Sequence, residues 1–446
     1  MSDATAAAAN GATGEGKPVH DFSNGATGGE EVVHDFSNGA TGDDELVRHL
    51  SNGATGGDEV VRDFSNGGTG GDEVVRDFSN GATGDDEAVR DFSNGATGDD
   101  EVVHDFSPLL LVYKSGRLER PLILPAVPPG RDAATGVESK DVALSPSTFV
   151  RLYLPPGATA GAGGEEKPAK LPVVVYFHGG GFVIGSAATC VYHRFLNDLA
   201  AACPAVAVSV DYRLAPEHLL PAAYEDSLAA LKWVLSAADP WLSGHGDLAR
   251  VLLAGDSAGA NICHHLAMHP DVKQGAGLKG IVLIHPWFWG KEPVGGEQEH
   301  RSPNGAPANG CRNGKGKRKS LWEFVCPDAA DGVDDPRMNP TAPGAPGLEK
   351  LACEKVMVCV AEGDHLRWRG KAYAEAAALA KAKAKGSPEP EPAAAVELFE
   401  SVGVGHVFYL LDPDMEEAKQ LLGRIAAFVN AKRAGERELH AACESE

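Results

Sequence analysis

The chain has 446 residues, 43% of them hydrophobic, which is enough for one large domain or two ordinary ones. Its formal net charge is −23, but the charge is uneven: residues 1–107 hold 23 acidic and 5 basic side chains, and the other 339 residues hold 40 and 35. The main body is therefore only mildly acidic, which argues against a nucleic-acid partner.

The sequence shows no sign of secretion, of a membrane span or of a metal site. Residues 1–18 lack the basic start and apolar run of a secretory signal, and no stretch reaches the roughly 20 apolar residues of a membrane helix. The eight cysteines are scattered, without CxxC pairs or histidine partners. We therefore expect a cytoplasmic protein with reduced thiols, no bound metal and no membrane partner.

Residues 20–107 repeat with a period of 14, and each copy carries one large apolar residue at the same place. These residues are Phe22, Phe36, Leu50, Phe64, Phe78, Phe92 and Phe106. A solenoid unit usually needs about 20 or more residues, and each copy here is rich in acids, glycine and small polar residues. Such copies cannot offset an ordering entropy of about 1–2 kcal/mol per residue. We therefore predict that residues 1–98 are disordered.

The last copy differs from the others because it runs directly into apolar sequence at 99–122. Phe106 and the leucines after it can therefore pack on a folded body. We interpret the earlier copies as tandem duplications of this one docked segment. The predicted organisation is an acidic repeat region at 1–98, one domain with its cap at 99–435, and a short tail at 436–446.

From about residue 140, short β-branched runs alternate with Ala- and Leu-rich amphipathic stretches. Strands are predicted at 148–155, 171–180, 205–212, 250–257, 280–286, 355–364 and 395–401. Helices are predicted at 191–203, 222–238, 259–269, 369–384 and 414–433. Several of the strands are continuously apolar, which is typical of parallel strands buried on both faces. The pattern predicts an α/β fold with a mostly parallel central sheet, whose functional residues collect at the carboxyl ends of the strands.

Ser257 lies in the sequence GDSAG, where a predicted strand ends and a predicted helix begins. A tight turn at such a place exposes the serine hydroxyl and needs small neighbours, here Gly255 and Gly259. The pattern alone is a weak signal, because a glycine-rich chain produces GxSxG by chance. The strand–turn–helix setting makes Ser257 a candidate nucleophile.

The sequence HGGGF at 178–182 follows the preceding apolar strand. Glycines let backbone N–H groups approach a substrate oxygen without side-chain obstruction. The N–H groups of Gly180 and Gly181, together with that of Ala258, can hold the oxyanion of a tetrahedral intermediate. The alternatives are a flexible glycine turn and a phosphate loop, and a phosphate loop would need a following Lys-Ser/Thr or a GxGxxG pattern, neither of which is present.

Asp364 ends the predicted strand 355–364, and His406 lies in the loop after the predicted strand 395–401. Both are therefore expected on the same rim of the sheet as Ser257. A serine hydroxyl needs a positioned base, and an imidazole base needs a carboxylate that orients it and stabilises its cation. The order Ser, Asp, His along the chain is the one expected of a hydrolase on this kind of sheet.

Other carboxylates and histidines compete for these roles. Asp334 and Asp335 lie in a loop without a preceding strand, and His264 and His265 lie within the helix after Ser257. His285 also ends a strand, but a proline and aromatic residues follow it, which favours a place in the pocket wall.

The motifs HGGGF, SVDYRLAPEH, GDSAGANI, DDPRMNP, AEGDHLRWRGKAYAEA and GVGHVF together resemble the plant carboxylesterases of the hormone-sensitive-lipase branch of α/β-hydrolases. The resemblance covers roughly residues 99–432. It implies the α/β-hydrolase fold, a small cap formed partly by the N-terminal segment, small ester substrates and no cofactor. It also implies a triad of Ser257, Asp364 and His406 and oxyanion donors at Gly180, Gly181 and Ala258.

Two features depart from this resemblance. Residues 298–320 are rich in Pro, Gly, Asn and basic residues, where the family usually has a helical cap segment. Val404 stands where the family commonly has an acidic residue, which affects the packing expected around His406.

The sequence therefore predicts a serine carboxylesterase that hydrolyses small carboxylic esters through an acyl-enzyme. One alternative is a non-catalytic hormone receptor, because the gibberellin receptors resemble this family but lack the triad histidine. The presence of His406 and the intact glycine loop argue against it. A dehydratase or a lactone-forming acyl-transfer enzyme would carry almost the same motifs. The expected partner is a small-molecule ester, and no oligomeric state is predicted.

Overall fold

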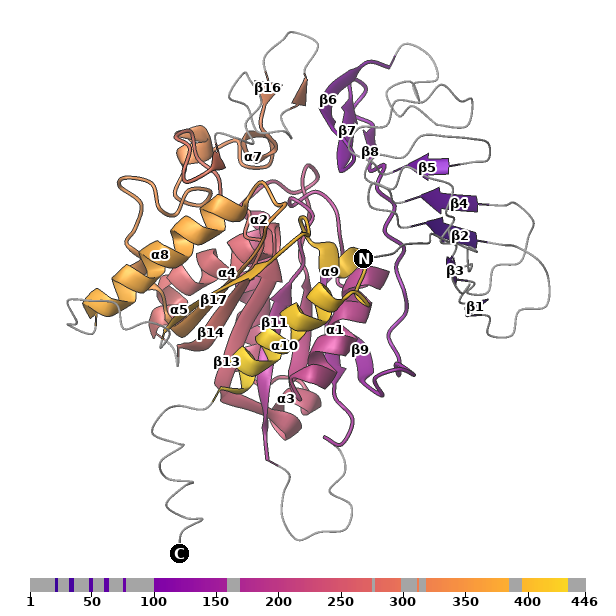
Figure 1. Ribbon diagram of the computed structural model, residues 1–446, viewed down its shortest axis with the longest axis vertical. Coiled ribbons are helices and arrows are strands. Elements are labelled where there is room, and N and C mark those ends of the chain that lie inside the picture. The colour runs from indigo at the N-terminus through magenta and orange to yellow at the C-terminus, as the bar shows by residue number, and fades with distance from the viewer. Residues whose placement is uncertain are drawn as a thin grey trace, which may run out of the picture. The chain divides into compact units, whose positions relative to one another are not determined.

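The computed structural model describes residues 100–158, 169–274, 277–297, 320–384 and 395–431, together with seven short strands outside those ranges. The chain divides into two compact units, Met1–Glu101 and Val102–Glu446 (Figure 1). The larger unit contains the central sheet and all the helices of the described residues.

The smaller unit contains five short strands in one sheet, in the order β1-β3-β2-β4-β5. They are β1 (Asp21–Phe22), β2 (Val32–Asp35), β3 (Arg48–Leu50), β4 (Val60–Asp63) and β5 (Val75–Asp77). Equivalent positions of the repeat pair where the strands are parallel: Val61 pairs with Val75 of the next copy and with Val33, two copies earlier. The rest of the region predicted to be disordered, 1–98, lies outside the described residues.

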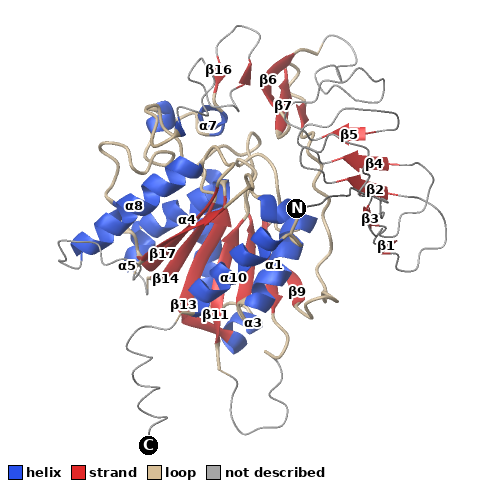
Figure 2. Cartoon of the chain, viewed as in Figure 1, coloured by secondary structure: helices blue, strands red, loops and turns tan. Residues whose placement is uncertain are grey.

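The central sheet of the larger unit has eight strands in the order β18-β17-β14-β13-β11-β12-β10-β9 (Figure 2). In chain order they are β9 (Glu138–Ser145), β10 (Thr148–Leu154), β11 (Leu171–Phe177), β12 (Val206–Asp211), β13 (Gly246–Asp256), β14 (Leu278–Ile284), β17 (Cys353–Ala361) and β18 (Val396–Ser401). Strands β11, β12, β13, β14, β17 and β18 are parallel to one another. Strand β10 pairs antiparallel with β12 on one side and with β9 on the other. The mostly parallel sheet predicted from the sequence is confirmed.

Helices cover both faces of this sheet. One core contains α2 (Ala222–Leu235), α4 (Ala258–Met268) and α8 (Arg367–Ala384), and the other contains α1 (Cys190–Ala202), α9 (Phe408–Leu411) and α10 (Glu416–Asn430). Strand residues alternate between the two cores: Val173 and Val175 belong to the first, Val174 and Tyr176 to the second. Because side chains of a strand point alternately to opposite faces, a wholly apolar strand is buried on both.

All seven predicted strands and all five predicted helices are present, with shifts of a few residues at their ends. The sequence reasoning missed the antiparallel edge strand β9, whose sequence ESKDVALS alternates between exposed and partly covered positions. It also missed several short elements. In the larger unit these are β6 (Val102–Phe106), β7 (Leu110–Tyr113), β8 (Leu118–Glu119), α3 (Pro240–His245), α5 (Pro270–Gln274), β15 (Cys311–Arg312), β16 (Arg318–Lys319), α7 (Leu321–Val325), η1 (Gly332–Asp334), η2 (Leu348–Lys350) and α9 (Phe408–Leu411).

The last repeat copy forms strand β6, which pairs with β7 in a small antiparallel sheet. Phe106 is 5% exposed, and its ring centroid lies 4.9 Å from that of Phe324 in α7. Farther along, Arg120 donates to the carbonyl oxygen of Val183 at 2.6 Å and pairs with Glu217 at 2.7 Å. The N-terminal segment of the larger unit is therefore bound beside the glycine loop, which ends near Val183.

Removal of residues 1–92 should leave unchanged the melting temperature of the remaining chain and the esterase activity that the sequence predicts. The physical reason is that Phe106 of the final copy already has a surface to bury against, within the larger unit. Thermal unfolding and steady-state kinetics of the truncated and full chains provide the comparison. A large loss in either quantity would mean that the earlier copies stabilise the larger unit.

No helix in the described part of the chain combines the length and apolar character needed to cross a membrane.

Candidate active site

The polar residues singled out in the sequence gather at one edge of the sheet. Parallel strands share the edge at which they end, and each of β11, β13, β14, β17 and β18 is followed by one or more of these residues. In the order of the strands, the residues are His178 to Gly181, Ser257, His285, Asp364 and His406.

Ser257 occupies a tight turn between β13 and α4, with φ 51° and ψ −114°. This conformation is costly for a residue with a side chain, about 1–3 kcal/mol. It is held by a hydrogen bond from the Ser257 N–H to the carbonyl oxygen of Ile284 at 2.9 Å. A Cβ atom at Gly255 would lie 2.6 Å from the backbone of Gly259 and 2.7 Å from the carbonyl oxygen of Phe177. The small neighbours expected of the turn are therefore required by its packing.

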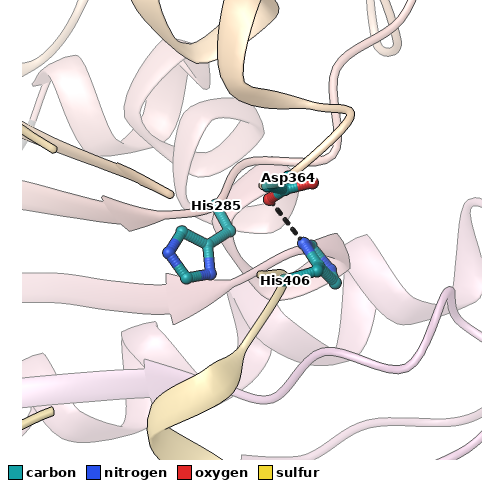
Figure 3. Close-up of side chains that lie close together, drawn as sticks. All are labelled: His285, Asp364 and His406. Atoms are coloured by element: carbon teal, nitrogen blue, oxygen red, sulfur yellow. Dashed lines mark hydrogen bonds and ion pairs between the residues drawn. The ribbon is translucent and has the colours of Figure 1, made fainter. Parts of the chain in front are cut away.

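Asp364 and His406 form a hydrogen-bonded pair, with His406 Nδ1 2.7 Å from Asp364 Oδ2 (Figure 3). The Asp364 side chain is 1% exposed and that of His406 is 30% exposed. Burial acts to raise the pKa of Asp364, but the charge and hydrogen bond of His406 outweigh it, so the pKa is well below its ordinary value. Burial acts to lower the pKa of His406, but Asp364 outweighs it and the pKa is raised.

Ser257 and His406 are connected through the end of strand β14. The carbonyl oxygen of Ile284 accepts a hydrogen bond from the N–H of Ser257. The next residue, His285, accepts a hydrogen bond at Nδ1 from the N–H of Val407, at 2.9 Å. Among the hydrogen bonds of the described residues, none joins Ser257 Oγ to the His406 ring. In enzymes without substrate this bond is often long and shortens only in the complex.

The glycine loop presents donors that the folded chain leaves unused. Gly180 and Gly181 have φ of 100° and 61°, which residues with a side chain rarely adopt. In the described part of the chain, the N–H groups of Gly180, Gly181 and Ala258 donate to no other group. Buried N–H groups without a partner are uncommon in proteins. The N–H groups of Gly181 and Ala258 belong to buried residues, and all three follow the adjacent strands β11 and β13, an arrangement suited to an oxyanion.

Asp256, immediately before Ser257, was not singled out from the sequence. It is 1% exposed, and its carboxylate accepts hydrogen bonds from Tyr176, Tyr192 and the N–H of Gly179 at 2.7–3.0 Å. Burial raises its pKa to about 6, although the two tyrosine hydrogen bonds act to lower it. Asp256 therefore links the turn at Ser257 to the glycine loop.

The competing carboxylates are held in ion pairs with basic side chains. Asp335 pairs with Arg337 at 2.7 Å, and Asp334 pairs with Lys291 at 3.4 Å. Asp334 lies in the short helix η1, with no strand before it, as the sequence indicated.

The competing histidines of helix α4 are packed into the protein. His264 Nδ1 lies 3.0 Å from the hydroxyl of Tyr373, and the ring of His265 stacks on Tyr224 with centroids 3.9 Å apart. Burial lowers their pKa values to about 3 and about 4.

His285 lies beside the pair of Asp364 and His406 (Figure 3), and the three residues each offer a nitrogen or oxygen atom within 4.8 Å of the others. Such a cluster has the residue types of a metal site. However, Asp364 Oδ2 and His406 Nδ1 are bonded to each other, and His285 Nδ1 is bonded to Val407. The hydrogen bonds of the protein itself account for this cluster.

The two departures from the family pattern have different outcomes. Val404 is 8% exposed and belongs to the second core, and its carbonyl oxygen accepts the N–H of Gly363, next to Asp364, at 2.9 Å. The valine thus joins the loops that carry Asp364 and His406. Most of the segment 298–320 lies outside the described residues. At its end, Ser320 caps helix α7 through a reciprocal pair of hydrogen bonds with Glu323.

Comparison with known proteins gives one family and a consistent set of relatives. A family described as alpha/beta hydrolase fold matches residues 174–409. "Probable carboxylesterase 13" from Arabidopsis thaliana is 40% identical over 341 residues, which are 73% of this chain and 97% of the relative. "Tuliposide A-converting enzyme 1, chloroplastic" from Tulipa gesneriana is 42% identical over 73% of this chain and 77% of its own. "2-hydroxyisoflavanone dehydratase" from Glycyrrhiza echinata is 40% identical over 72% and 94%.

Solved structures with similar folds include an esterase from the fungus Rhizomucor miehei. It has a TM-score of 0.50 and 26% identity and covers 66% of this chain and 82% of its own. An ester hydrolase from the metagenome of Lake Arreo has a TM-score of 0.51 at 24% identity and covers 68% and 84%. The second likeness, at this identity, concerns the fold alone.

Proposed function

Because the chain belongs to the α/β-hydrolase family, among its plant carboxylesterases, we propose that it hydrolyses small carboxylic esters with Ser257 as nucleophile. The family, the fold and the class of enzyme predicted from the sequence, a carboxylic ester hydrolase, are confirmed by the relatives. The roles of individual residues are our proposal. The observation that carries it is the hydrogen-bonded pair of His406 and the buried Asp364, on the sheet edge that also presents Ser257.

In the first half of the reaction, His406 removes the proton of Ser257 as the hydroxyl attacks the ester carbonyl carbon. His406 Nδ1 donates to Asp364, so Nε2 is the nitrogen that accepts this proton. The ionised Asp364 stabilises the resulting imidazolium. The tetrahedral oxyanion accepts hydrogen bonds from Gly180, Gly181 and Ala258. The C–O bond to the alcohol then breaks, and His406 gives the alcohol its proton.

In the second half, water attacks the acyl-enzyme with His406 again as base. The tetrahedral intermediate forms at the same donors, the acid leaves, and Ser257 regains its proton. No cofactor or metal takes part in this mechanism. General-base assistance of this kind contributes about 100–10,000-fold to the rate.

A Gly181→Ala variant should lose about 100-fold or more in kcat, because it disturbs a proposed oxyanion donor. Gly181 has a positive φ, and a Cβ atom there would lie 2.8 Å from Cδ2 of Leu321. The Leu321 side chain can move aside, but the positive φ is strained for alanine, so the backbone at residue 181 should move away from its present conformation. Gly423→Ala, in helix α10 with nothing within 4 Å of the added Cβ, is the matched control. Steady-state kinetics of both variants check the expectation, and an unchanged kcat in Gly181→Ala would remove this residue from the oxyanion site.

The substrate class is tested with a panel of p-nitrophenyl esters that differ in acyl length. We expect turnover of short acyl esters, with one preferred length set by the cap. Absence of turnover across the whole panel, together with saturable binding of a hormone, would instead support a receptor.

Dehydration is a second candidate because one relative at 40% identity is named 2-hydroxyisoflavanone dehydratase. It would use the same sheet edge but release water from the substrate without an acyl-enzyme. Product analysis by mass spectrometry separates the two reactions, since hydrolysis adds the mass of water and dehydration removes it.

We also propose that the enzyme is located in the cytoplasm, as predicted from the sequence. Six cysteines in the described part of the chain are free thiols, which is consistent with a reducing compartment. Relatives named chloroplastic and amyloplastic show that the family is not confined to one location. Imaging of a fluorescent fusion of the full chain tests the location, and signal in plastids would contradict it.

A further inference from the structure

The most informative group outside the proposed machinery is His285, which follows strand β14. It is 1% exposed and has φ 47°, so a buried histidine is held in the left-handed region. Its backbone N–H is bonded to the carbonyl oxygen of Cys359 in the neighbouring strand β17, at 2.8 Å. The sheet therefore fixes the backbone of His285 independently of its side-chain contacts.

The side chain of His285 makes one hydrogen bond in the described part of the chain. Nδ1 lies 2.9 Å from the backbone N of Val407, and Nε2 is buried without a partner among the described residues. An N–H donor requires an unprotonated acceptor, so Nδ1 is bare and the proton of the neutral ring is on Nε2. Burial lowers the pKa of His285 to about 3, so the ring stays neutral in the working range.

The donor of this bond, Val407, is the residue after His406 and has an unusual backbone conformation. Val407 has φ 50° and ψ 28°, a conformation that is rare for a β-branched residue. The hydrogen bond from Val407 to His285 holds this backbone, and the carbonyl oxygen of Val407 accepts the N–H of Leu410 at the start of α9. His406 is thus held by Asp364 at its ring and by His285 at its backbone.

We propose that His285 is a positioning residue for His406: its Nδ1 accepts the Val407 N–H and so orients the imidazole toward Ser257. This inference rests on the proposed function. The groups that face the His285 ring are His406 and Phe408, each with centroids 5.7 Å away, Tyr409 at 6.1 Å, and the carboxylate of Asp364. A neutral ring is required here, because a second cation would oppose the imidazolium that forms on His406.

The test compares two amide side chains at this position. In His285→Asn the carboxamide oxygen stands close to the place of Nδ1, and asparagine tolerates the left-handed backbone. In His285→Gln the carboxamide is one bond farther out, near the place of Nε2. We expect kcat of the Asn variant within about threefold of the wild type. We expect kcat of the Gln variant to be ~10- to 100-fold lower with KM nearly unchanged, because a small misplacement of the base is costly.

The control variant is Ile281→Val, a fully buried position on the same strand β14. It should lower the melting temperature without changing kcat, which separates loss of packing from loss of positioning. His285→Ala provides a further variant without an acceptor. Fluorescence-detected melting shows which variants are folded before kinetics are measured.

Rescue by Asn but not by Gln or Ala supports the inference. Wild-type kcat in the Gln and Ala variants would overturn it, and so would an Asn variant as slow as the Gln variant. Failure of the proposed function is recognised separately, because the wild-type chain would then show no esterase activity that depends on Ser257.

Discussion

Replacement of Ser257 by alanine should abolish hydrolysis of a short p-nitrophenyl ester, with a loss of about 10⁴-fold or more in kcat. The variant lacks the oxygen that forms the acyl bond, while the turn that holds residue 257 is made by backbone hydrogen bonds and remains available. Alanine pays a similar cost for the left-handed φ, so the fold should be retained. Initial-rate measurements at saturating substrate give the comparison.

The matched control is Ser236→Ala, at the exposed end of helix α2, where the hydroxyl donates a hydrogen bond to the carbonyl oxygen of Trp233. It should have wild-type kcat and KM. Retained activity in Ser257→Ala would exclude Ser257 as nucleophile, provided that circular dichroism shows both variants folded.

The second large effect is expected from Asp364→Asn, with a loss of about 10⁴-fold in kcat. The carboxamide has the shape of the carboxylate but no charge, so it neither stabilises the imidazolium of His406 nor selects the tautomer with a free Nε2. Asp364 raises the pKa of His406. His406 is protonated, and inactive as a base, below its pKa, so kcat/KM of the wild type should fall as the pH drops from neutrality.

Removal of the Asp364 charge lowers the pKa of His406. The loss of the variant's residual kcat/KM at acidic pH (the acid limb of its pH profile) should therefore occur at lower pH than in the wild type. Asp414→Asn, at an exposed ion pair with Arg194, is the control and should leave both the rate and the limb in place. An Asp364→Asn variant with near wild-type kcat, or with its limb at higher pH, would contradict the role of this carboxylate.

The sheet and the positions of the proposed residues were accessible from sequence because they follow local rules. An apolar strand, a small-residue turn and an amphipathic helix are each visible in a single stretch, as at Ser257. Parallel strands then bring their carboxyl ends together, so residues as far apart as 257 and 406 fall on one edge. The edge strand β9 was missed because a half-exposed strand has no strong apolar signal.

The supporting contacts were not accessible, because they depend on geometry that no single stretch encodes. The hydrogen bond from Val407 to His285 joins residues 122 positions apart and occurs together with a left-handed backbone at Val407. The burial of Asp256 by two tyrosines joins residues 64 and 80 positions away along the chain. The Asp within GDSAG was a signal for these contacts of Asp256, because a buried carboxylate needs hydrogen-bond donors around it.

The most direct test of the account is to identify the residue that reacts covalently. The full chain is incubated with a fluorophosphonate, an ester-like reagent that phosphonylates activated serines, and is then digested and analysed by mass spectrometry. We predict a single added mass on Ser257, and its absence when His406 is replaced by alanine. A label on another residue, or no label in a chain that still hydrolyses esters, would contradict the assignment of Ser257 and His406.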